Sequence, residues 1–125
     1  MVDLNSIKNK KAKYKIKHIH EETFDENIWV CYGTPAKYFI KQIEKELSIT
    51  LELKRFKDGK AFEVELKDGS ILYVIWTKKK DVSILAHEVL HVVHWLLGAK
   101  GMSLSCDSEE AYCYLLQRII RAVLA

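Results

Sequence analysis

Three histidines and one glutamate lie within the apolar segment ILAHEVLHVVHWLLG, residues 84–98. Titratable side chains are costly to bury without a partner, so their spacing is informative. His87, Glu88 and His91 form the pattern H-E-x-x-H. On a helix, His87 and His91 lie about 40° apart around the axis and about 6 Å apart along it, so both imidazoles can bind one ion. Glu88 projects beside that ion, where a carboxylate can take a proton from water. The pattern therefore predicts a zinc site with Glu88 as the catalytic base.

A catalytic zinc site usually has a third protein ligand. His94 is close to His87 on the helical wheel but lies about 10.5 Å away along the axis, so a straight helix cannot bring both to one ion. His94 is therefore either a contact in the cleft or a partly buried histidine. Glu109 and Glu110, which open the last predicted helix, are better candidates for the third ligand. Because Asp107-x-x-Glu110 is also a capping-box pattern, the spacing alone leaves both glutamates open.

The elements that would position these residues follow from periodicity and from turn signals. Strands are predicted at 14–22, 27–33, 49–56 and 60–78, the last folded into a hairpin at Asp68-Gly69. Helices are predicted at 34–49, with Thr34 as the cap and Pro35 in the first position, from 81 or 83 to about 97, and at 108–124. This order predicts an α+β domain with one small mixed or antiparallel sheet and about three helices.

Two further expectations concern the surroundings of the histidines. The segment 71–76 is almost wholly apolar, so we expect it to be buried on both faces or beside a groove, and to form the floor of the cleft. If it is an edge strand, an extended peptide can add to the sheet there. Asp81 or Ser83 is expected to cap the histidine-bearing helix, and Gly98 and Gly101 are plausible stops.

The bulk properties predict a single domain over residues 1–125, with a flexible basic tail at 1–13. The net charge is only +3, and six lysines fall between residues 8 and 17. We do not expect nucleic-acid binding, because no known nucleic-acid module accompanies this charge. The three cysteines lack CxxC spacing and predict reduced thiols. With no secretory signal and no long apolar run, we expect a cytoplasmic protein without a membrane segment. The oligomeric state stays open.

The segment SILAHEVLHVVHWLLGAKGMSLSCDSEEAYCYLLQRII, residues 83–120, resembles a family of small zinc metallopeptidases encoded by bacteriophages and prophages. Members carry AHExxH on a helix, then a short glycine-containing loop, then a helix that opens with an acidic pair followed by alanine. The resemblance covers most of residues 60–120. It implies a minimal zincin with a thermolysin-like ligand set, located in the host bacterial cytoplasm. One Zn²⁺ per chain would be held by His87, His91 and Glu110, with Glu88 as the base.

One departure from the thermolysin-like pattern affects the third ligand. That pattern would place the distal acid at position 108, where this chain has Ser108. The phage pattern, with the acid directly before alanine, fits better and selects Glu110, with Glu109 as the alternative.

These residues predict a zinc-dependent peptidase acting on a peptide or protein substrate. Zinc would polarise the scissile carbonyl, and Glu88 would pass the proton of the attacking water to the leaving amine. His94, Tyr112 and Tyr114 are candidate donors to the oxyanion, with ordinary packing as the alternative for each.

Two other functions are compatible with the same residues. One is a non-catalytic, zinc-stabilised phage binding or assembly protein, whose function Glu88→Gln would leave intact. The other is a nucleic-acid-associated protein acting through the lysines between residues 8 and 17, with strongly salt-dependent affinity. Two histidines and a carboxylate can also hold iron(II), so the metal itself stays open.

Overall fold

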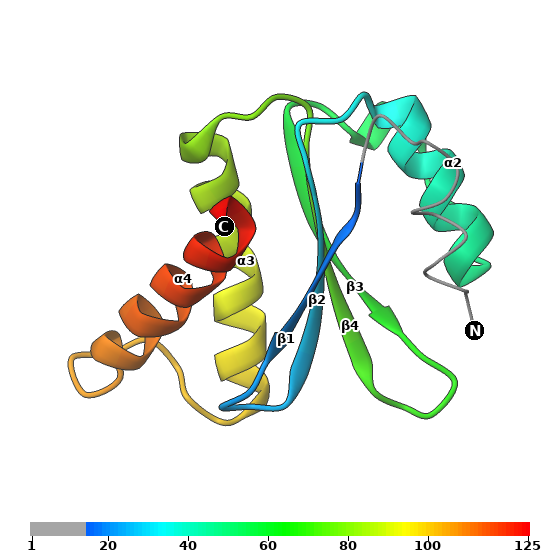
Figure 1. Ribbon diagram of the computed structural model, residues 1–125. Helices are drawn as coiled ribbons and strands as arrows, with labels where there is room; N and C mark the ends of the chain where they lie inside the picture. Colours follow the sequence, from blue (N-terminus) through cyan, green and yellow to red (C-terminus); the bar gives the residue numbers. More distant parts are fainter. Residues whose placement is uncertain (1–14) are drawn as a thin grey trace.

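The structure is a computed structural model that describes residues 15–125, so the predicted tail at 1–13 lies outside the described residues. A four-stranded sheet is covered by α2 on one face and by α3 and α4 on the other (Figure 1). The elements are, in chain order, β1 (Lys17–Glu21), β2 (Glu26–Tyr32), α2 (Ala36–Leu47), the 3₁₀ turn η1 (Leu53–Arg55), β3 (Gly59–Glu65), β4 (Ile71–Thr77), α3 (Val82–Ala99) and α4 (Glu109–Leu124). The predicted α+β class, with a small mixed sheet and three helices, is confirmed.

The strands lie in the order β1-β2-β4-β3. β2 and β4 are parallel, whereas β1 pairs antiparallel with β2 and β3 pairs antiparallel with β4. The predicted β3–β4 hairpin is present, and Gly69 in its turn has a φ of 87°, which favours glycine. β4 is therefore an inner strand, and β1 and β3 form the two edges. The condition that 71–76 forms an edge strand is not met, because β4 pairs with β2 on one side and with β3 on the other. The predicted burial of its apolar run on both faces is confirmed.

The core consists of two clusters, one on each face of the sheet. Alternate residues of β4 serve both, since Tyr73 and Ile75 belong to the cluster under α3 and α4, while Val74 and Trp76 belong to the cluster under α2. The helices supply the remaining buried side chains, among them Leu85, Val89, Val92, Val93, Leu96, Leu97, Leu115 and Ile119 of α3 and α4, and Phe39, Ile40 and Ile43 of α2.

The prediction of a strand at 49–56 is wrong, since this segment contains only the turn η1. Its polar groups are engaged locally rather than in a ladder. The Leu51 N–H donates to a Glu44 carboxylate oxygen at 2.7 Å. Lys54 and Arg55 each form an ion pair with Glu52. The segment 49–56 therefore adds no strand beside β3, and β3 remains an edge of the sheet.

Thr34 does not cap α2, contrary to the prediction. The helix begins at Ala36, and its start has no side-chain cap. Thr34 is instead buried, and its hydroxyl accepts a hydrogen bond from Sγ of Cys31 at 3.0 Å. Cys31 is buried as well, and this burial raises the pKa of its thiol to about 11. All three cysteines are free, as predicted.

The ends of α3 and α4 agree with the predictions in part. Asp81 caps α3, and its carboxylate accepts from the Ser83 N–H at 2.9 Å. Gly98 lies within α3, whereas Gly101, with a φ of 81°, follows its end. The capping box at the start of α4 is not formed, because Ser108 occupies the cap position without a side-chain bond to the helix.

α3 is long and apolar enough to cross a membrane, judged by length and composition alone. The core helix of a soluble protein shares both properties, and seven residues of α3 are buried within this fold. The absence of a membrane segment stays a prediction.

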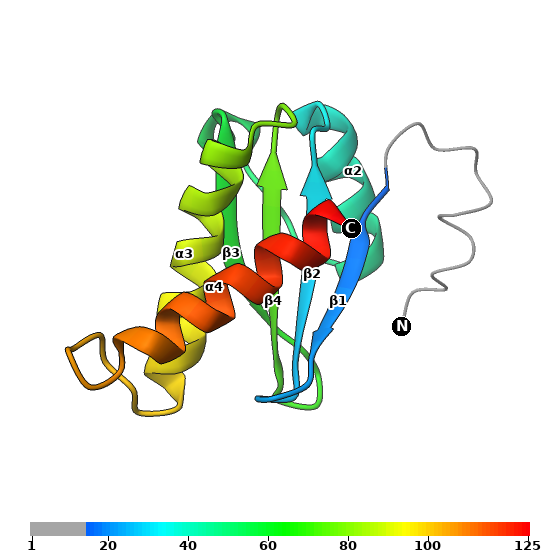
Figure 2. The same ribbon diagram turned by 60° about the vertical axis from the view of Figure 1, so that its left-hand side comes forward.

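α4 crosses α3 and ends beside β1 (Figure 2). Two contacts attach it to that strand. Lys17 donates through Nζ to the Ala122 and Val123 carbonyls in the last turn of α4 and to Ala125 directly after it. Arg118 forms an ion pair with the buried carboxylate of Glu21 at 3.1 Å. The last helix is thereby fixed to the β1 edge of the sheet face that the histidine-bearing helix also covers.

Candidate metal centre

His87, Glu88 and His91 come together on the first half of α3. One potential ligand atom from each lies within 4.8 Å of the others. Two nitrogens bound to one zinc ion at about 2.0–2.1 Å are at most about 4.2 Å apart, so small side-chain rotations bring both imidazoles onto a single ion. The predicted H-E-x-x-H group on a helix is confirmed, and its donor atoms fit a divalent metal.

Both histidines are exposed, and their orientation is partly set by rings. The His87 and His91 centroids are 5.0 Å apart at an interplanar angle of 73°. His91 also stacks on Trp95, with centroids 5.8 Å apart and an angle of 22°. Trp95 therefore limits the rotation of His91, while both histidine residues remain exposed.

Glu88 differs from the two histidines because it is buried, with only 7% of its surface exposed. Its side chain faces the start of β3, where Gly59 leaves room for it. A Cβ at Gly59 would lie 2.9 Å from Oε2 of Glu88. Burial raises the pKa of Glu88, and the nearby His87, His91 and Lys60 lower it in part. A carboxyl group with a raised pKa is better suited to accept a proton from water and to return it.

The strand beside the group is β3, an edge of the sheet. α3 packs against both β3 and β4. A metal ion at His87 and His91 would thus lie close to a strand with unpaired backbone groups. Gly59 falls between the strands predicted at 49–56 and 60–78, and its role was not predicted because it depends on contact with a helix distant in the sequence.

The predicted third ligands lie at the start of α4. Glu109 and Glu110 are both exposed in its first turn, and neither belongs to the group within 4.8 Å. α3 and α4 are in contact, so the first turn of α4 lies in the same part of the molecule as the last turns of α3. Glu110 as the third ligand, with Glu109 as the alternative, stays a prediction that requires movement of the side chain or of this turn.

The candidate oxyanion donors are placed differently. Tyr112 is buried, and its hydroxyl donates to the Met102 carbonyl at 2.7 Å, which ties the loop after α3 to α4. The hydroxyl proton of Tyr112 is thus already used in a hydrogen bond within the fold. His94 and Tyr114 are exposed, and their role as donors stays a prediction.

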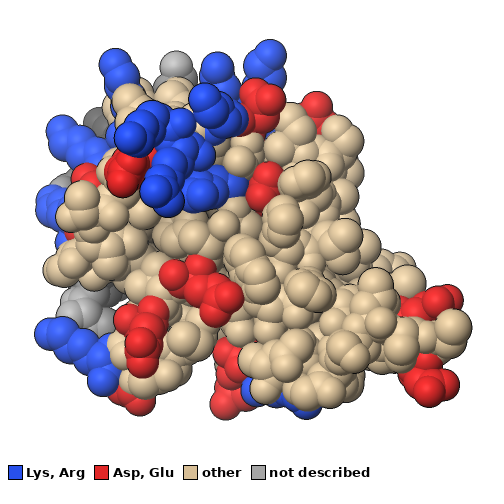
Figure 3. Space-filling view, turned by 180° about the vertical axis from the view of Figure 1, so that it is seen from behind, with Lys and Arg blue, Asp and Glu red and all other residues tan. Residues whose placement is uncertain are grey.

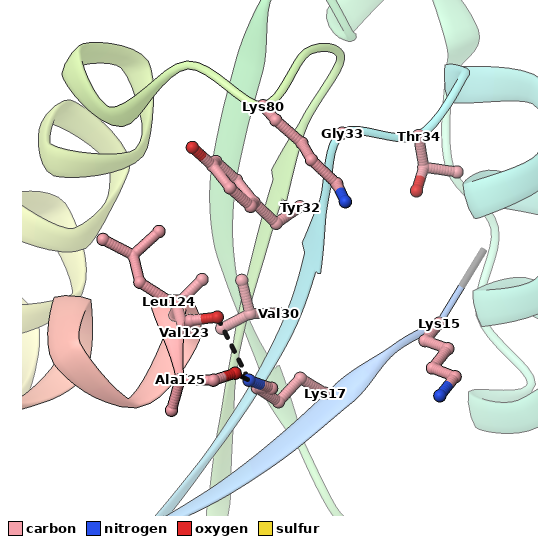
Figure 4. A pocket seen from close by; sticks show the side chains of 10 residues that line it. All are labelled: Lys15, Lys17, Val30, Tyr32, Gly33, Thr34, Lys80, Val123, Leu124 and Ala125. Atoms are coloured by element: carbon pink, nitrogen blue, oxygen red, sulfur yellow. Dashed lines mark hydrogen bonds between the residues drawn. The ribbon is translucent and has the colours of Figure 1, made fainter.

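A hollow of the described surface lies away from these residues. It has a volume of about 520 Å³ and is bounded by Lys15, Lys17, Lys80 and the end of α4 (Figure 4). Lys17 reaches across it to the last carbonyls of α4. None of the predicted site residues lines it. The histidine group is therefore a surface site beside a strand edge.

Comparisons with protein-family models, with curated proteins and with solved structures give no match to this chain. The class defined by the fold and the site is accordingly an α+β protein with a candidate His-Glu-His metal site on a core helix.

Proposed function

We propose that this protein is a zinc-dependent peptidase in which His87 and His91 bind the metal and Glu88 is the general base. The observation that carries the proposal is the position of Glu88. Its carboxylate is buried against the free edge strand β3, while the two histidines at its side remain exposed to solvent. Burial of a carboxylate costs free energy, and packing of a helix on a sheet does not require one between two exposed imidazoles.

The proposed reaction is hydrolysis of a peptide bond. Bound zinc would supply a Lewis acid for the scissile carbonyl and lower the pKa of water. Glu88 takes the proton of the attacking water and returns it to the leaving nitrogen, which separates the two products. Burial raises the pKa of Glu88, which favours uptake of the proton from water before it passes to the leaving nitrogen.

The substrate would lie along β3. An edge strand offers unpaired N–H and C=O groups, and an extended peptide can pair with them. Because Gly59 begins β3 directly beside Glu88, a peptide paired there passes the metal group. This assigns to β3 the role that the sequence suggested for the segment 71–76.

We include Glu110 in the proposal as the third ligand, brought to the ion by a shift of the first turn of α4. The phage or prophage origin and the host cytoplasm as location belong to the same proposal, on the strength of the resemblance over residues 83–120.

The test is metal content by elemental analysis, on protein purified without chelator and then incubated with zinc. We expect about one zinc per chain. His87→Ala and His91→Ala should lose it, and Glu110→Ala should bind it at least tenfold more weakly, whereas Glu109→Ala should not. His20→Ala, which removes an exposed histidine on β1, is the matched control.

Hydrolysis of a fluorogenic peptide library then tests turnover. Glu88→Gln should keep the zinc and lose at least 100-fold in rate. A parent protein that binds zinc but cleaves nothing would favour the non-catalytic binding protein. A parent protein that binds no zinc would exclude the metal site altogether.

A further inference from the structure

Three lysines lie where β3 begins beside the metal group. Lys57 and Lys60 flank the first residue of the strand, and Lys78 follows the end of β4, whereas Lys79 and Lys80 continue that loop toward Gly33. The two segments are joined by a hydrogen bond from the Lys78 N–H to the Asp58 carbonyl at 2.8 Å. Seen from behind, Lys and Arg side chains collect along the upper part of the surface (Figure 3).

The charge of this cluster is only partly compensated. Within residues 15–125, none of these three lysines forms an ion pair within 4.0 Å. Asp58 lies in the segment before β3 and Asp81 in the loop before α3. The Asp81 carboxylate is engaged in capping α3. Lys60 lies over the Phe56 ring, 5.8 Å from its centroid, so its charge is held at the start of β3 without a carboxylate partner.

The far end of β3 has the opposite charge. Glu63 and Glu65 are exposed, and neither forms an ion pair in the described part of the chain. Strand alternation places them on the same face of the sheet as Gly59 and Ala61, which is the face covered by α3. The free edge is therefore positive where it meets the metal group and negative at its other end.

We propose that this edge selects extended peptides by the order of their charges, with basic residues on the N-terminal side and acidic residues on the C-terminal side. The direction follows from pairing, since antiparallel strands are more stable and more common than parallel ones. An antiparallel peptide has its N-terminal part beside Glu65 and its C-terminal part beside Lys57. Opposite charges on paired strands attract one another, so this order is favoured. The inference deepens the proposed function and rests on it.

Two labelled nine-residue peptides of identical composition test the proposal. Each has two lysines at one end, two glutamates at the other and five small apolar residues between, and only the order differs. Binding is measured by fluorescence anisotropy with the zinc-loaded full chain carrying Glu88→Gln, so that no cleavage intervenes. We expect the peptide with N-terminal lysines to bind about tenfold more tightly at low salt, with the difference falling at 0.5 M salt.

Charge-reversal variants identify the residues. Lys57→Glu with Lys78→Glu should remove the preference, and adding Glu63→Lys with Glu65→Lys should reverse it. Lys37→Glu with Lys41→Glu, which makes the same charge change on exposed positions of α2, should leave it unchanged. Equal binding of the two peptides, or tighter binding of the reverse order, would overturn the proposal. Tighter binding of a short DNA duplex than of either peptide would also overturn the proposal.

Cleavage is measured separately with the parent protein and the same peptides. A charge-order preference in binding without any cleavage would contradict the peptidase and leave the charge selection standing. Cleavage of both peptides at equal rates and with equal affinities would support the peptidase and contradict the charge selection.

Discussion

Gly59 lies directly against the side chain of Glu88. A Cβ at Gly59 would come within 2.9 Å of Oε2 of Glu88 and within 2.7 Å of Cγ2 of Ile84. Gly59 is the first residue of the edge strand, so the lack of a side chain there lets the helix approach the strand closely. The glycine therefore determines where the carboxylate lies.

Gly59→Ala should displace Glu88, because the added methyl group and the carboxylate cannot occupy the same space. We expect a loss of about 1–3 kcal/mol in the free energy of unfolding, measured by urea denaturation. Peptidase activity should fall at least tenfold, with zinc binding retained because His87 and His91 are not touched.

Gly98→Ala is the matched control for this substitution. Gly98 lies in α3, and a Cβ there would meet nothing within 4 Å. It should raise the free energy of unfolding by about 0.5–1 kcal/mol, since alanine favours the helix. Equal effects of the two substitutions would contradict the assigned role of Gly59.

Trp95→Leu tests whether the tryptophan positions His91. The stacked rings limit the rotation of the imidazole, so their loss should weaken zinc binding by about 3–10-fold, measured by competition with a chelating dye. Trp29→Leu is the control, because Trp29 also contacts a histidine ring, that of His18, but on β1 and β2. A comparable loss of zinc affinity in both variants would indicate a general destabilisation instead.

The His-Glu-His group was predictable from the sequence because its geometry is local. A helix fixes the relation between His87 and His91 through its period alone, and Asp81 marks where that helix begins. The burial of 71–76 and the hairpin at Asp68-Gly69 were predictable for the same reason, since both depend on neighbouring residues.

The surroundings of the group depend on distant elements and were not predictable. Strand order decides that β3 rather than β4 is the edge, and no local pattern encodes that order. The contact between Gly59 and Glu88 joins residues 29 positions apart. The segment 49–56 forms no strand, and its Leu51 N–H donates to Glu44 instead of to a neighbouring strand, a contact that local alternation does not encode.

Arg118→Met tests the attachment of α4 to β1. Glu21 is 6% exposed, and its carboxylate accepts from the Phe24 N–H at 2.7 Å as well as pairing with Arg118. Removal of the arginine leaves a buried carboxylate with a single partner, so we expect a loss of about 1–3 kcal/mol in the free energy of unfolding. Arg121→Met, at an exposed position in the same helix, should change it by less than about 0.5 kcal/mol. Equal losses would show that the ion pair is not what attaches α4.

Glu46 gives the protein a pH-dependent stability that is separate from the metal group. Both of its carboxylate oxygens are buried without a hydrogen-bond partner among the described residues. Burial raises its pKa from 4.5 to about 7, and the neighbouring Lys45 lowers it in part. The folded state thus holds the proton more tightly than the unfolded state does. The stabilising contribution is fully present below about pH 4.5 and is lost as the pH rises through about 7.

Glu46→Gln should remove this loss, because the amide carries no charge to desolvate. We expect the variant to be more stable than the parent by about 1–2 kcal/mol at pH 8, a value reduced for partial solvent screening, and of similar stability at pH 4. The measurement is the difference between the two urea-unfolding free energies across this pH range, which cancels the other titrating groups. Glu22→Gln, at an exposed position, should give a flat difference. A flat difference for Glu46→Gln as well would mean that the carboxyl group is solvated in the folded protein.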